Sequence, residues 1–269
     1  MSNNINAREL ALKVLYKIEK EKAYSNIALD EELSKYKLDN KDIGLASELV
    51  YGVVTWKLTL DEIIKKYSKI KLKKISVWIL NILRIGIYQI IFLDKIPDFG
   101  AVNECVKLAK RYGHNASSGF VNAVLRKVSI KDLEELSCVK DEKENIAVTT
   151  SHPVWLVEKL LKEFDSEFVK DMCKSNNKKA NLTARVNTLK ISRDDLVKIL
   201  KNKDIECENG ILENTITLKN LKNIASLKEF NEGLFMIQDE AATLVSTILS
   251  PKPSDVVLDA CAAPRWKNN

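Results

Sequence analysis

Metal-binding and disulfide-forming patterns are missing from this sequence. Its 269 residues include only 5 cysteines and 2 histidines. Cys105, Cys138, Cys173, Cys207 and Cys261 are widely spaced, with neither a Cys-x-x-Cys pair nor a histidine at the spacing of a zinc ligand. We therefore expect no metal site and no disulfide framework. Reduced thiols of this kind are typical of a cytoplasmic protein.

Long apolar segments are also missing. The N-terminus lacks the apolar stretch of a signal peptide. The most apolar run, Val77–Leu93, is interrupted by Asn81, Arg84 and Gln89, whereas a membrane span needs roughly 18 or more apolar residues. We expect a central helix of an α-helical core there, no membrane segment and a cytoplasmic location. A charge inside such a helix predicts a structural ion pair for Arg84.

Basic residues are concentrated in the N-terminal half. Residues 1–140 contain 24 Lys and Arg against 17 Asp and Glu, a balance of +7, and the remaining residues contribute −1 to the net charge of +6. A basic domain favours an anionic partner, most often nucleic acid. The alternative is the compositional bias of a chain rich in Lys, Asn and Ile, and composition alone leaves both open.

The first 130 residues show the hydrophobic period of consecutive helices. Asn6 is placed to cap a helix with apolar residues at helical spacing. A second helix is expected to open at Ser25 or Asn26, and a third is expected after Asn40. Pro97 separates the apolar helix from the helices that follow it. Short helices joined by short loops predict a globular all-α bundle for residues 1–130.

Several cations stand near the predicted helix ends of this bundle, where they can reach phosphate without being buried. They are Arg8, Lys110, Arg111, Arg126 and Lys127. We predict that Arg8, Lys110, Arg111 and Arg126 contact RNA. The alternative for any one of them is an ordinary solvated charge.

Several blocks of this half resemble the N-terminal domain of the bacterial ribosomal RNA small-subunit methyltransferase B family, which is related to the NusB antitermination factor. The blocks are Ala7-Arg8, Glu48 to Val53, Leu83 to Gln89, Ile96-Pro97, Ala101 to Glu104 with Leu108 to Lys110, and Gly119 to Arg126. The resemblance implies an RNA-binding helical bundle. The blocks from Pro97 onward are more similar to the methyltransferase than to free-standing NusB.

The segment after the bundle continues this resemblance. Residues 131–150 are charged and lack a long apolar pattern, which predicts a linker with short helical pieces. The block from Ser151 to Leu156, Ser-His-Pro-Val-Trp-Leu, is similar to one in the same family. Ser151 is placed to cap a helix that buries Trp155. This gives His152 a structural explanation, and no oriented partner for catalysis is evident.

From Asn181 the apolar residues alternate as in strands. The pattern predicts a ferredoxin-like β-α-β-β-α-β domain. Its strands are expected at residues 182–186, 205–208, 215–218 and 234–237, and its helices at 192–200 and 222–230. Arg185 lies in a block, Arg-Val-Asn-Thr, that resembles part of the family's RNA-gripping small domain; the alternative is a domain that serves packing alone. We group residues 151–238 as a helical lead-in plus this small α+β domain on the RNA side.

Residues 239–269 resemble the family's entry into its methyltransferase domain. Asp239 is placed to cap a helix, and Val256 to Leu258 predict the remnant first strand of a Rossmann-like domain. The block from Asp259 to Pro264 looks like the family's first S-adenosylmethionine motif, which normally continues Gly-Gly-Lys. The cofactor-binding residues that the motif implies are Cys261, Ala262, Ala263, Pro264 and Lys267.

The same block departs from the family at its glycines. Arg265 and Trp266 occupy the two glycine positions, where side chains add bulk against the cofactor. The resemblance implies methylation of carbon 5 of a cytosine, in which one cysteine thiolate adds to the ring and a second cysteine helps to eliminate the enzyme. These cysteines belong to Pro-Cys and Thr-Cys motifs, and none of the five cysteines here has that context. We therefore predict no catalytic residue and no bound S-adenosylmethionine in this chain, and a tail over residues 251–269 that is poorly ordered, folded back or self-associating.

Two functions remain open. The first is the RNA-binding portion of a 16S ribosomal RNA cytosine-C5 methyltransferase, truncated at the cofactor motif, with RNA as its partner. The alternative is a non-enzymatic NusB-like RNA-binding protein that acts in transcription antitermination or ribosome biogenesis.

Overall fold

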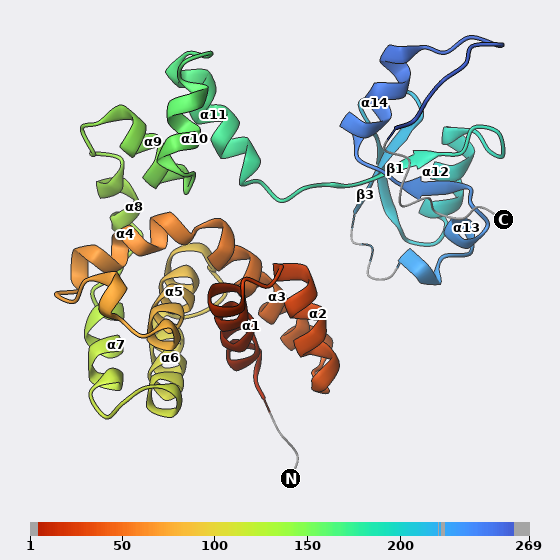
Figure 1. Cartoon of the computed structure of the whole chain (residues 1–269). Coiled ribbons are helices and arrows are strands. Elements are labelled where there is room, and N and C mark those ends of the chain that lie inside the picture. The colour runs from red at the N-terminus through yellow and green to blue at the C-terminus, as the bar shows by residue number, and fades with distance from the viewer. Residues whose placement is uncertain (1–4, 220, 222–223, 261–269) are drawn as a thin grey trace. The chain divides into compact units, whose positions relative to one another are not determined.

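A computed structural model describes residues 5–219, 221 and 224–260 (Figure 1). The chain forms two compact units that divide after Lys178. The first unit is entirely helical in its described part, and the second is built on a four-stranded sheet. The predicted order, an all-α bundle followed by a small α+β domain, is confirmed.

The helices of the first unit follow one another through short loops. They are α1 (Ala7–Glu21), α2 (Ser25–Lys35), α3 (Asn40–Thr55), α4 (Lys57–Tyr67), the 3-10 turn η1 (Leu72–Lys74), α5 (Val77–Phe92), α6 (Asp98–Tyr112), α7 (Ser117–Leu125), α8 (Lys131–Leu136), α9 (Glu142–Thr150), α10 (Val154–Leu160) and α11 (Ser166–Asn176). The side chain of Asn6 accepts a hydrogen bond from the Glu9 amide at 2.9 Å, so the predicted cap of α1 is confirmed.

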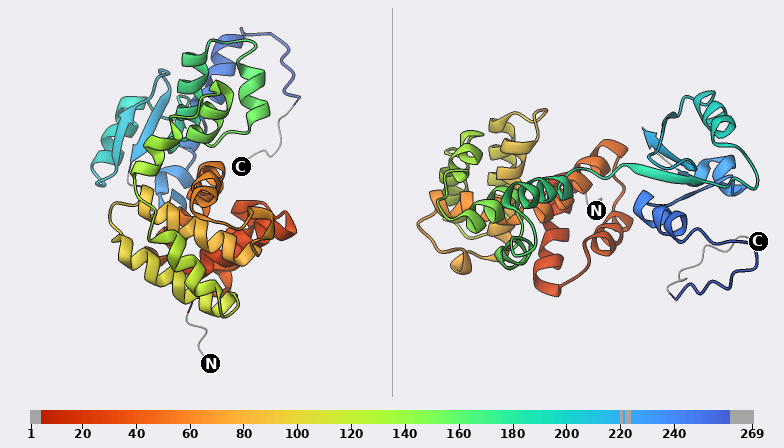
Figure 2. Two further views of the ribbon diagram at one scale, coloured as in Figure 1. Left: turned by 90° about the vertical axis from the view of Figure 1, so that its left-hand side faces the viewer. Right: turned by 90° about the horizontal axis from the view of Figure 1, so that it is seen from above.

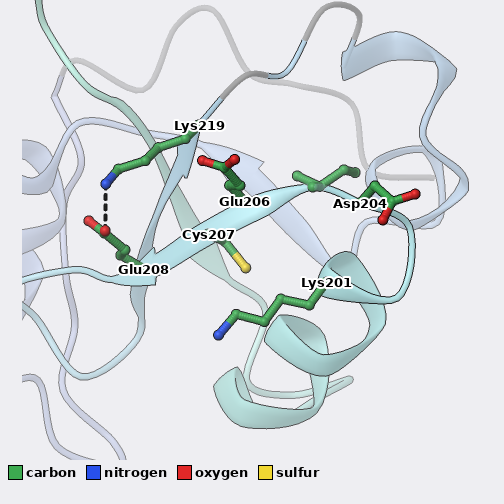
Figure 3. Close-up of a pocket in the computed structure, with 7 residues that line it drawn as sticks. Lys201, Asp204, Glu206, Cys207, Glu208 and Lys219 are labelled. Atoms are coloured by element: carbon green, nitrogen blue, oxygen red, sulfur yellow. Dashed lines mark hydrogen bonds and ion pairs between the residues drawn. The ribbon is translucent and has the colours of Figure 1, made fainter.

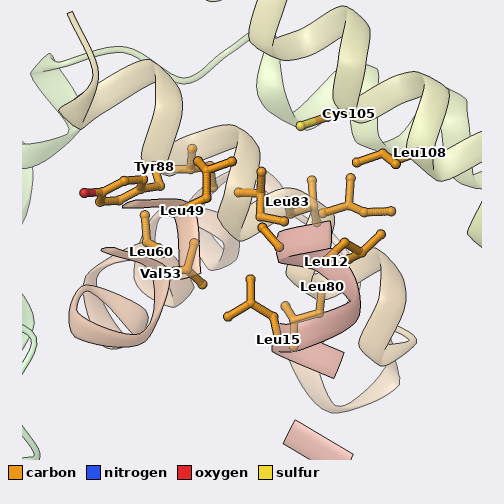
Figure 4. Packing of buried hydrophobic residues seen from close by; sticks show 14 of the residues in the cluster. Leu12, Leu15, Leu49, Val53, Leu60, Leu80, Leu83, Tyr88, Cys105 and Leu108 are labelled. Carbon is orange, nitrogen blue, oxygen red and sulfur yellow. The ribbon is translucent and has the colours of Figure 1, made fainter. Parts of the chain in front are cut away.

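The core of the first unit surrounds α5. This helix is buried on nearly all sides, and Leu12 of α1, Leu49 of α3, Leu60 of α4 and Leu108 of α6 belong to the same apolar cluster (Figure 4). A helix that is apolar all round must be enclosed by other helices. The run that suggested a membrane span is therefore the centre of the bundle, and no helix in the described residues is long and apolar enough to cross a membrane.

Arg84 of α5 is held by a buried ion pair, as predicted. Its Nε and Nη2 donate to the two carboxylate oxygens of Asp61 at 2.7 and 2.8 Å. Its Nη1 donates to Glu19 at 3.1 Å and to the side-chain oxygen of Asn81 at 3.0 Å. The guanidinium is thus satisfied inside the bundle and serves its stability.

The segment around residue 151 differs from the expectation in detail. Ser151 ends α9 in the left-handed conformation, with φ of 57°, and does not cap α10, which begins after Pro153. Its hydroxyl accepts instead from the Leu58 amide of α4 at 3.0 Å. Trp155 was expected in the core and is 66% exposed. The predictions of a Ser151 cap and a buried Trp155 were wrong. The Ser151 hydroxyl is bound to Leu58 instead of α10, and the face of α10 that packs on α9 and α11 carries Val157, with Leu160 and Leu161 partly buried beside it.

Helices α9 to α11 share a small apolar cluster within the first unit. Ile146 and Ala147 of α9, Val157 of α10, and Val169 and Cys173 of α11 are all buried there. The segment 131–150, expected as a linker, thus consists largely of α8 and α9. The helical lead-in that the sequence grouped with the sheet, α10 and α11, packs on α9.

The second unit is a ferredoxin-like domain. Its elements are β1 (Leu182–Val186), α12 (Arg193–Lys201), β2 (Glu206–Asn209), β3 (Thr215–Lys219), η2 (Ile224–Ser226), α13 (Lys228–Asn231), β4 (Phe235–Ile237) and α14 (Glu240–Leu249). The strand order is β2-β3-β1-β4, and each neighbouring pair is antiparallel. Two further views show α12 beside the sheet, on which its Leu196 and Leu200 are buried (Figure 2).

Two predictions for the second unit have different outcomes. Asp239 accepts from the Ala241 amide at 2.8 Å, so the cap of α14 is confirmed. Val256, Val257 and Leu258 do not form the predicted strand, and Val256 is fully exposed. These three residues pair with neither β2 nor β4, the two edge strands of the described sheet.

Candidate nucleic-acid interface

Helices α6 and α7 carry most of the cations that the sequence singled out. Helix α6 starts after Pro97, whose fixed φ suits a helix start, and ends at Gly113. A side chain at Gly113 would lie 2.6 Å from Ser117 and 2.7 Å from the Ala109 carbonyl oxygen. Only glycine therefore allows the chain to turn so closely from α6 into α7.

Lys110 and Arg111 lie in the last turn of α6 but differ in their contacts. Lys110 is exposed and makes no ion pair with any described residue. Arg111 donates to the Glu9 carboxylate at 2.7 Å, and its guanidinium lies 5.6 Å from the centre of the Tyr112 ring. Glu9 is only 5% exposed, so Arg111 neutralises a buried charge of α1. It holds α6 to α1 while its own side chain stays largely in solvent.

Tyr112 completes this contact. Its hydroxyl donates to the other oxygen of Glu9 at 2.6 Å. Burial, together with this hydrogen bond to an anion, raises the pKa of Tyr112 above its ordinary value of 10.0. The phenol therefore stays protonated at neutral pH and acts as a donor, which fixes the end of α6.

Arg126 and Lys127 follow the last residue of α7. Both are exposed, and neither pairs with a carboxylate in the described part of the chain. Arg126 lines a groove of about 520 Å³ that also contains Phe99 of the first turn of α6. The two helices thus run in opposite directions, and Lys110 and Arg126 lie at opposite ends of the α6–α7 pair. With a rise of 1.5 Å per residue, Phe99 and Arg111 are about 18 Å apart along α6.

Arg8 is the least available of the predicted RNA contacts in the bundle. Its Nε donates to the side-chain oxygen of Gln89 at 2.6 Å, and the residue is half-buried. Gln89 in turn donates to the Ile85 carbonyl at 2.9 Å. Arg8 therefore ties α1 to α5, and only part of its guanidinium is left for a ligand.

Arg185 belongs to the second unit. It lies in β1, is half-buried, and contacts the Met236 sulfur of β4 at 3.0 Å. It borders a hollow of about 350 Å³ together with Asn187 and Asn214. Amide and guanidinium groups at one strand end are suited to hydrogen-bond a polar ligand.

A second hollow in the same unit has the opposite character. It follows the edge strand β2, where Asp204, Glu206 and Glu208 lie with Lys201 and Lys219 (Figure 3). Lys219 is already paired with Glu208. The excess of carboxylates disfavours phosphate, and charged side chains on an edge strand protect it from pairing with another chain. We assign this hollow no ligand.

His152 has a structural contact. Its Nδ1 lies 2.7 Å from the Thr150 carbonyl oxygen, at the end of α9. The same oxygen accepts from the Asn177 side chain at 2.6 Å. No carboxylate orients the ring within the described residues. The contact accounts for His152 as part of the packing between α9 and α11.

The implied cofactor residues Cys261, Ala262, Ala263, Pro264 and Lys267 lie outside the described residues, as do Arg265 and Trp266. Of the described cysteines, Cys105, Cys173 and Cys207 are buried, and Cys138 is exposed.

The groove between α6 and α7 was not predicted from the sequence. Phe99, Asn103 and Asn122 line this groove with Arg126, and none of the three was a candidate site residue. A local signal was present: Phe99 and Asn103, and likewise Asn122 and Arg126, are four residues apart and thus share a helix face. The pattern did not reveal that the two faces meet.

Comparisons with known proteins agree with the two-part fold. Residues 5–129 match the NusB family, and residues 152–225 match the ferredoxin-like domain of RsmF/B-like methyltransferases. The chain is 37% identical to the probable ribosomal RNA small subunit methyltransferase B of Bacillus subtilis (strain 168), over 97% of this chain and 58% of that protein. It is 32% identical to the protein of the same name from Synechocystis, over 98% of this chain and 59% of that protein.

A solved structure supports the same arrangement of elements. The crystal structure of PH0851 superimposes with a TM-score of 0.61 at 21% identity, covering 94% of this chain and 57% of that one. The chain therefore spans somewhat under two thirds of the length of the proteins it matches.

Proposed function

The chain belongs to the ribosomal RNA small subunit methyltransferase B family, and from this we propose that it forms the RNA-binding portion of an enzyme that methylates 16S ribosomal RNA. In this proposal the target is carbon 5 of a cytosine, and S-adenosylmethionine supplies the methyl group. The helical bundle and the ferredoxin-like domain hold the RNA. The chemistry belongs to the methyltransferase domain that the family carries.

The exposed cations of α6 and α7 carry the proposal. Lys110, Arg126 and Lys127 are free of carboxylate partners among the described residues, so their charge is available to phosphate. Arg111 and Arg8 contribute less, because each holds a neighbouring helix. The match of a ferredoxin-like domain next to the bundle favours the methyltransferase portion over the alternative of a free-standing NusB-like factor.

Binding of a labelled fragment of small-subunit ribosomal RNA at several salt concentrations tests the proposal. We expect the variant Lys110→Gln/Arg126→Gln/Lys127→Gln to bind more weakly. The slope of log K against log salt should fall by about 2 to 3 in magnitude, since each phosphate contact contributes roughly 0.7 to 0.9. Arg111 is left unchanged because Glu9 is buried against it.

A charge-matched variant provides the control. Lys20, Lys37 and Lys41 are exposed and lie on or beside α1 to α3. Their replacement by Gln removes the same net charge and should leave the slope close to that of the unchanged chain. Equal slopes for both triple variants, or no RNA binding by the unchanged chain, would refute the proposal.

Cofactor binding by this chain is a separate part of the proposal. Arg265 and Trp266 stand where the family has glycines, so we expect isothermal titration with S-adenosylmethionine to give no specific heat. The variant Arg265→Gly/Trp266→Gly is the matched comparison. Micromolar binding by the unchanged chain would contradict our interpretation of the motif.

A further inference from the structure

The groove between α6 and α7 combines an aromatic face with polar groups. Its polar and aromatic lining comes from Asp98, Phe99 and Asn103 of α6, Asn122 of α7, and Arg126. Its apolar floor includes the buried side chains of Val102 and Leu125. The volume of about 520 Å³ lies within the range of roughly 300–1,000 Å³ that is usual for ligand sites.

The exposed ring of Phe99 has no explanation in the packing of the bundle. It is 80% exposed and makes no ring contact with any described residue. The side chains of Asn103, Asn122 and Arg126 also make no hydrogen bond or ion pair in the described part of the chain. One exposed ring and three polar side chains without a protein partner among the described residues therefore line one groove.

These groups match the parts of an unpaired nucleotide. An aromatic ring offers a stacking face to any base. An asparagine amide presents one donor group and one acceptor and can pair with a base edge. An arginine recognises a phosphate. The Asp98 carboxylate repels phosphate from the α6 side of the groove. The sugar-phosphate backbone of the RNA is therefore expected on the other side, at Arg126 and Lys127.

We propose that this groove holds a single unpaired base of the bound RNA. The base stacks on Phe99, the amides of Asn103 and Asn122 contact its edge, and Arg126 with Lys127 binds the adjoining phosphate. A base inside a duplex cannot expose its face in this way, so the groove selects a single-stranded or bulged segment. This inference rests on the proposed function, and it adds the conformation of the RNA that the bundle recognises.

Binding of a short single-stranded RNA to the full chain tests the inference. We expect Phe99→Ala to weaken binding by about 5- to 150-fold, which corresponds to the loss of one stacked base. Phe99→Trp should retain the affinity. Tyr24→Ala is the matched control, because Tyr24 is a similarly exposed ring, 75% exposed, at the start of α2.

An RNA of the same length with abasic sites separates stacking from charge. Against this probe, Phe99→Ala should bind no more weakly than the unchanged chain, because no base is left to stack. An equal loss for both probes would overturn the inference, since it would assign Phe99 to the support of the backbone contacts. Phe99 is exposed, so far-ultraviolet circular dichroism of the variant should match that of the unchanged chain.

The two proposals fail in different ways. If Phe99→Ala binds single-stranded RNA like the unchanged chain while Lys110→Gln/Arg126→Gln/Lys127→Gln binds weakly, the groove inference is wrong and the proposed function stands. If the unchanged chain binds no ribosomal RNA at all, both are wrong.

Discussion

Arg84 allows a quantitative test of what holds the bundle together. Its side chain is 3% exposed and pairs through two hydrogen bonds with Asp61, whose side chain is 13% exposed. Its third nitrogen reaches Glu19, which also has Lys57 at 3.0 Å. The substitution Arg84→Met keeps a long side chain in α5 and removes the charge and all its donors.

The expected cost follows from the groups left behind. Asp61 loses its cation inside a largely dry site, whereas Glu19 keeps Lys57. Removal of one partner of a buried pair costs about 3–5 kcal/mol. Because Glu19 stays paired, we expect the lower end, about 3 kcal/mol. The double variant Arg84→Met/Asp61→Leu should be less destabilised than Arg84→Met, because it leaves no unpaired carboxylate at position 61.

Denaturation followed by tryptophan fluorescence measures this cost in the first unit. Trp78 stacks on Tyr16 at 3.9 Å and Trp56 on Phe92 at 4.7 Å, so both indoles report on the bundle. A loss of less than about 1 kcal/mol would place the pair among ordinary surface ion pairs and refute the reasoning. A double variant at least as unstable as the sum of the two single variants would refute it equally.

The same network predicts a dependence on pH. Burial raises the pKa of Glu19, but the hydrogen bond from Lys57 and the charge of Arg84 outweigh it and hold the pKa below its ordinary value of 4.5. A lowered carboxyl pKa stabilises the fold above the unfolded value, and this contribution is lost as the pH falls through the folded value. Arg84→Met removes one cause of the lowering, so the pKa of Glu19 in the folded chain moves closer to its value in the unfolded chain. The stability difference between the variant and the unchanged chain should therefore narrow below about pH 4.5.

Two further predictions concern packing and thiol reactivity. Gly52→Ala would place a Cβ 2.0 Å from the Tyr88 ring, with an expected loss of about 1–3 kcal/mol. Gly44→Ala lies in the same helix, and its Cβ would have nothing within 4 Å. Its free energy of unfolding should rise by up to about 1 kcal/mol. Equal stabilities of the Gly52→Ala and Gly44→Ala variants in chemical denaturation would contradict both expectations. Burial raises the pKa of Cys105 to about 12, so alkylation of the folded chain should spare Cys105 while it labels the exposed Cys138. Peptide mass spectrometry after a timed reaction measures this, and early labelling of Cys105 would count against it.

Features set by neighbouring residues could be predicted from the sequence. The caps at Asn6 and Asp239 each depend on a side chain and an amide two or three residues away. The strand alternation and helix period of the second unit likewise lie within each element, and they sufficed for the ferredoxin-like order. Arg84 was predictable because a charge in the most apolar helix requires a partner, although nothing local identified Asp61.

Features set by distant residues could not be predicted. The Ser151 hydroxyl accepts from Leu58, 93 residues earlier in the chain, and this contact competes with the local cap. Trp155 looked like a core residue because it is apolar in a helical pattern. Helix α10 is only 7 residues long and buries Val157 alone, so composition could not decide which side chain it buries.

The candidate interface shows the same limit with a functional consequence. The sequence placed Lys110, Arg111 and Arg126 in one group of cations near predicted helix ends, together with Arg8 and Lys127. In the structure, Arg111 lies about 18 Å along α6 from Phe99 and its groove. Arg111 also donates to Glu9 and so holds α6 against α1. An RNA that reaches both Lys110 and Arg126 must therefore extend along α6, which a single nucleotide cannot do. Exposed cations at the two ends and a groove of about 520 Å³ at one end together favour, under our proposals, an extended single strand whose register is set at Phe99.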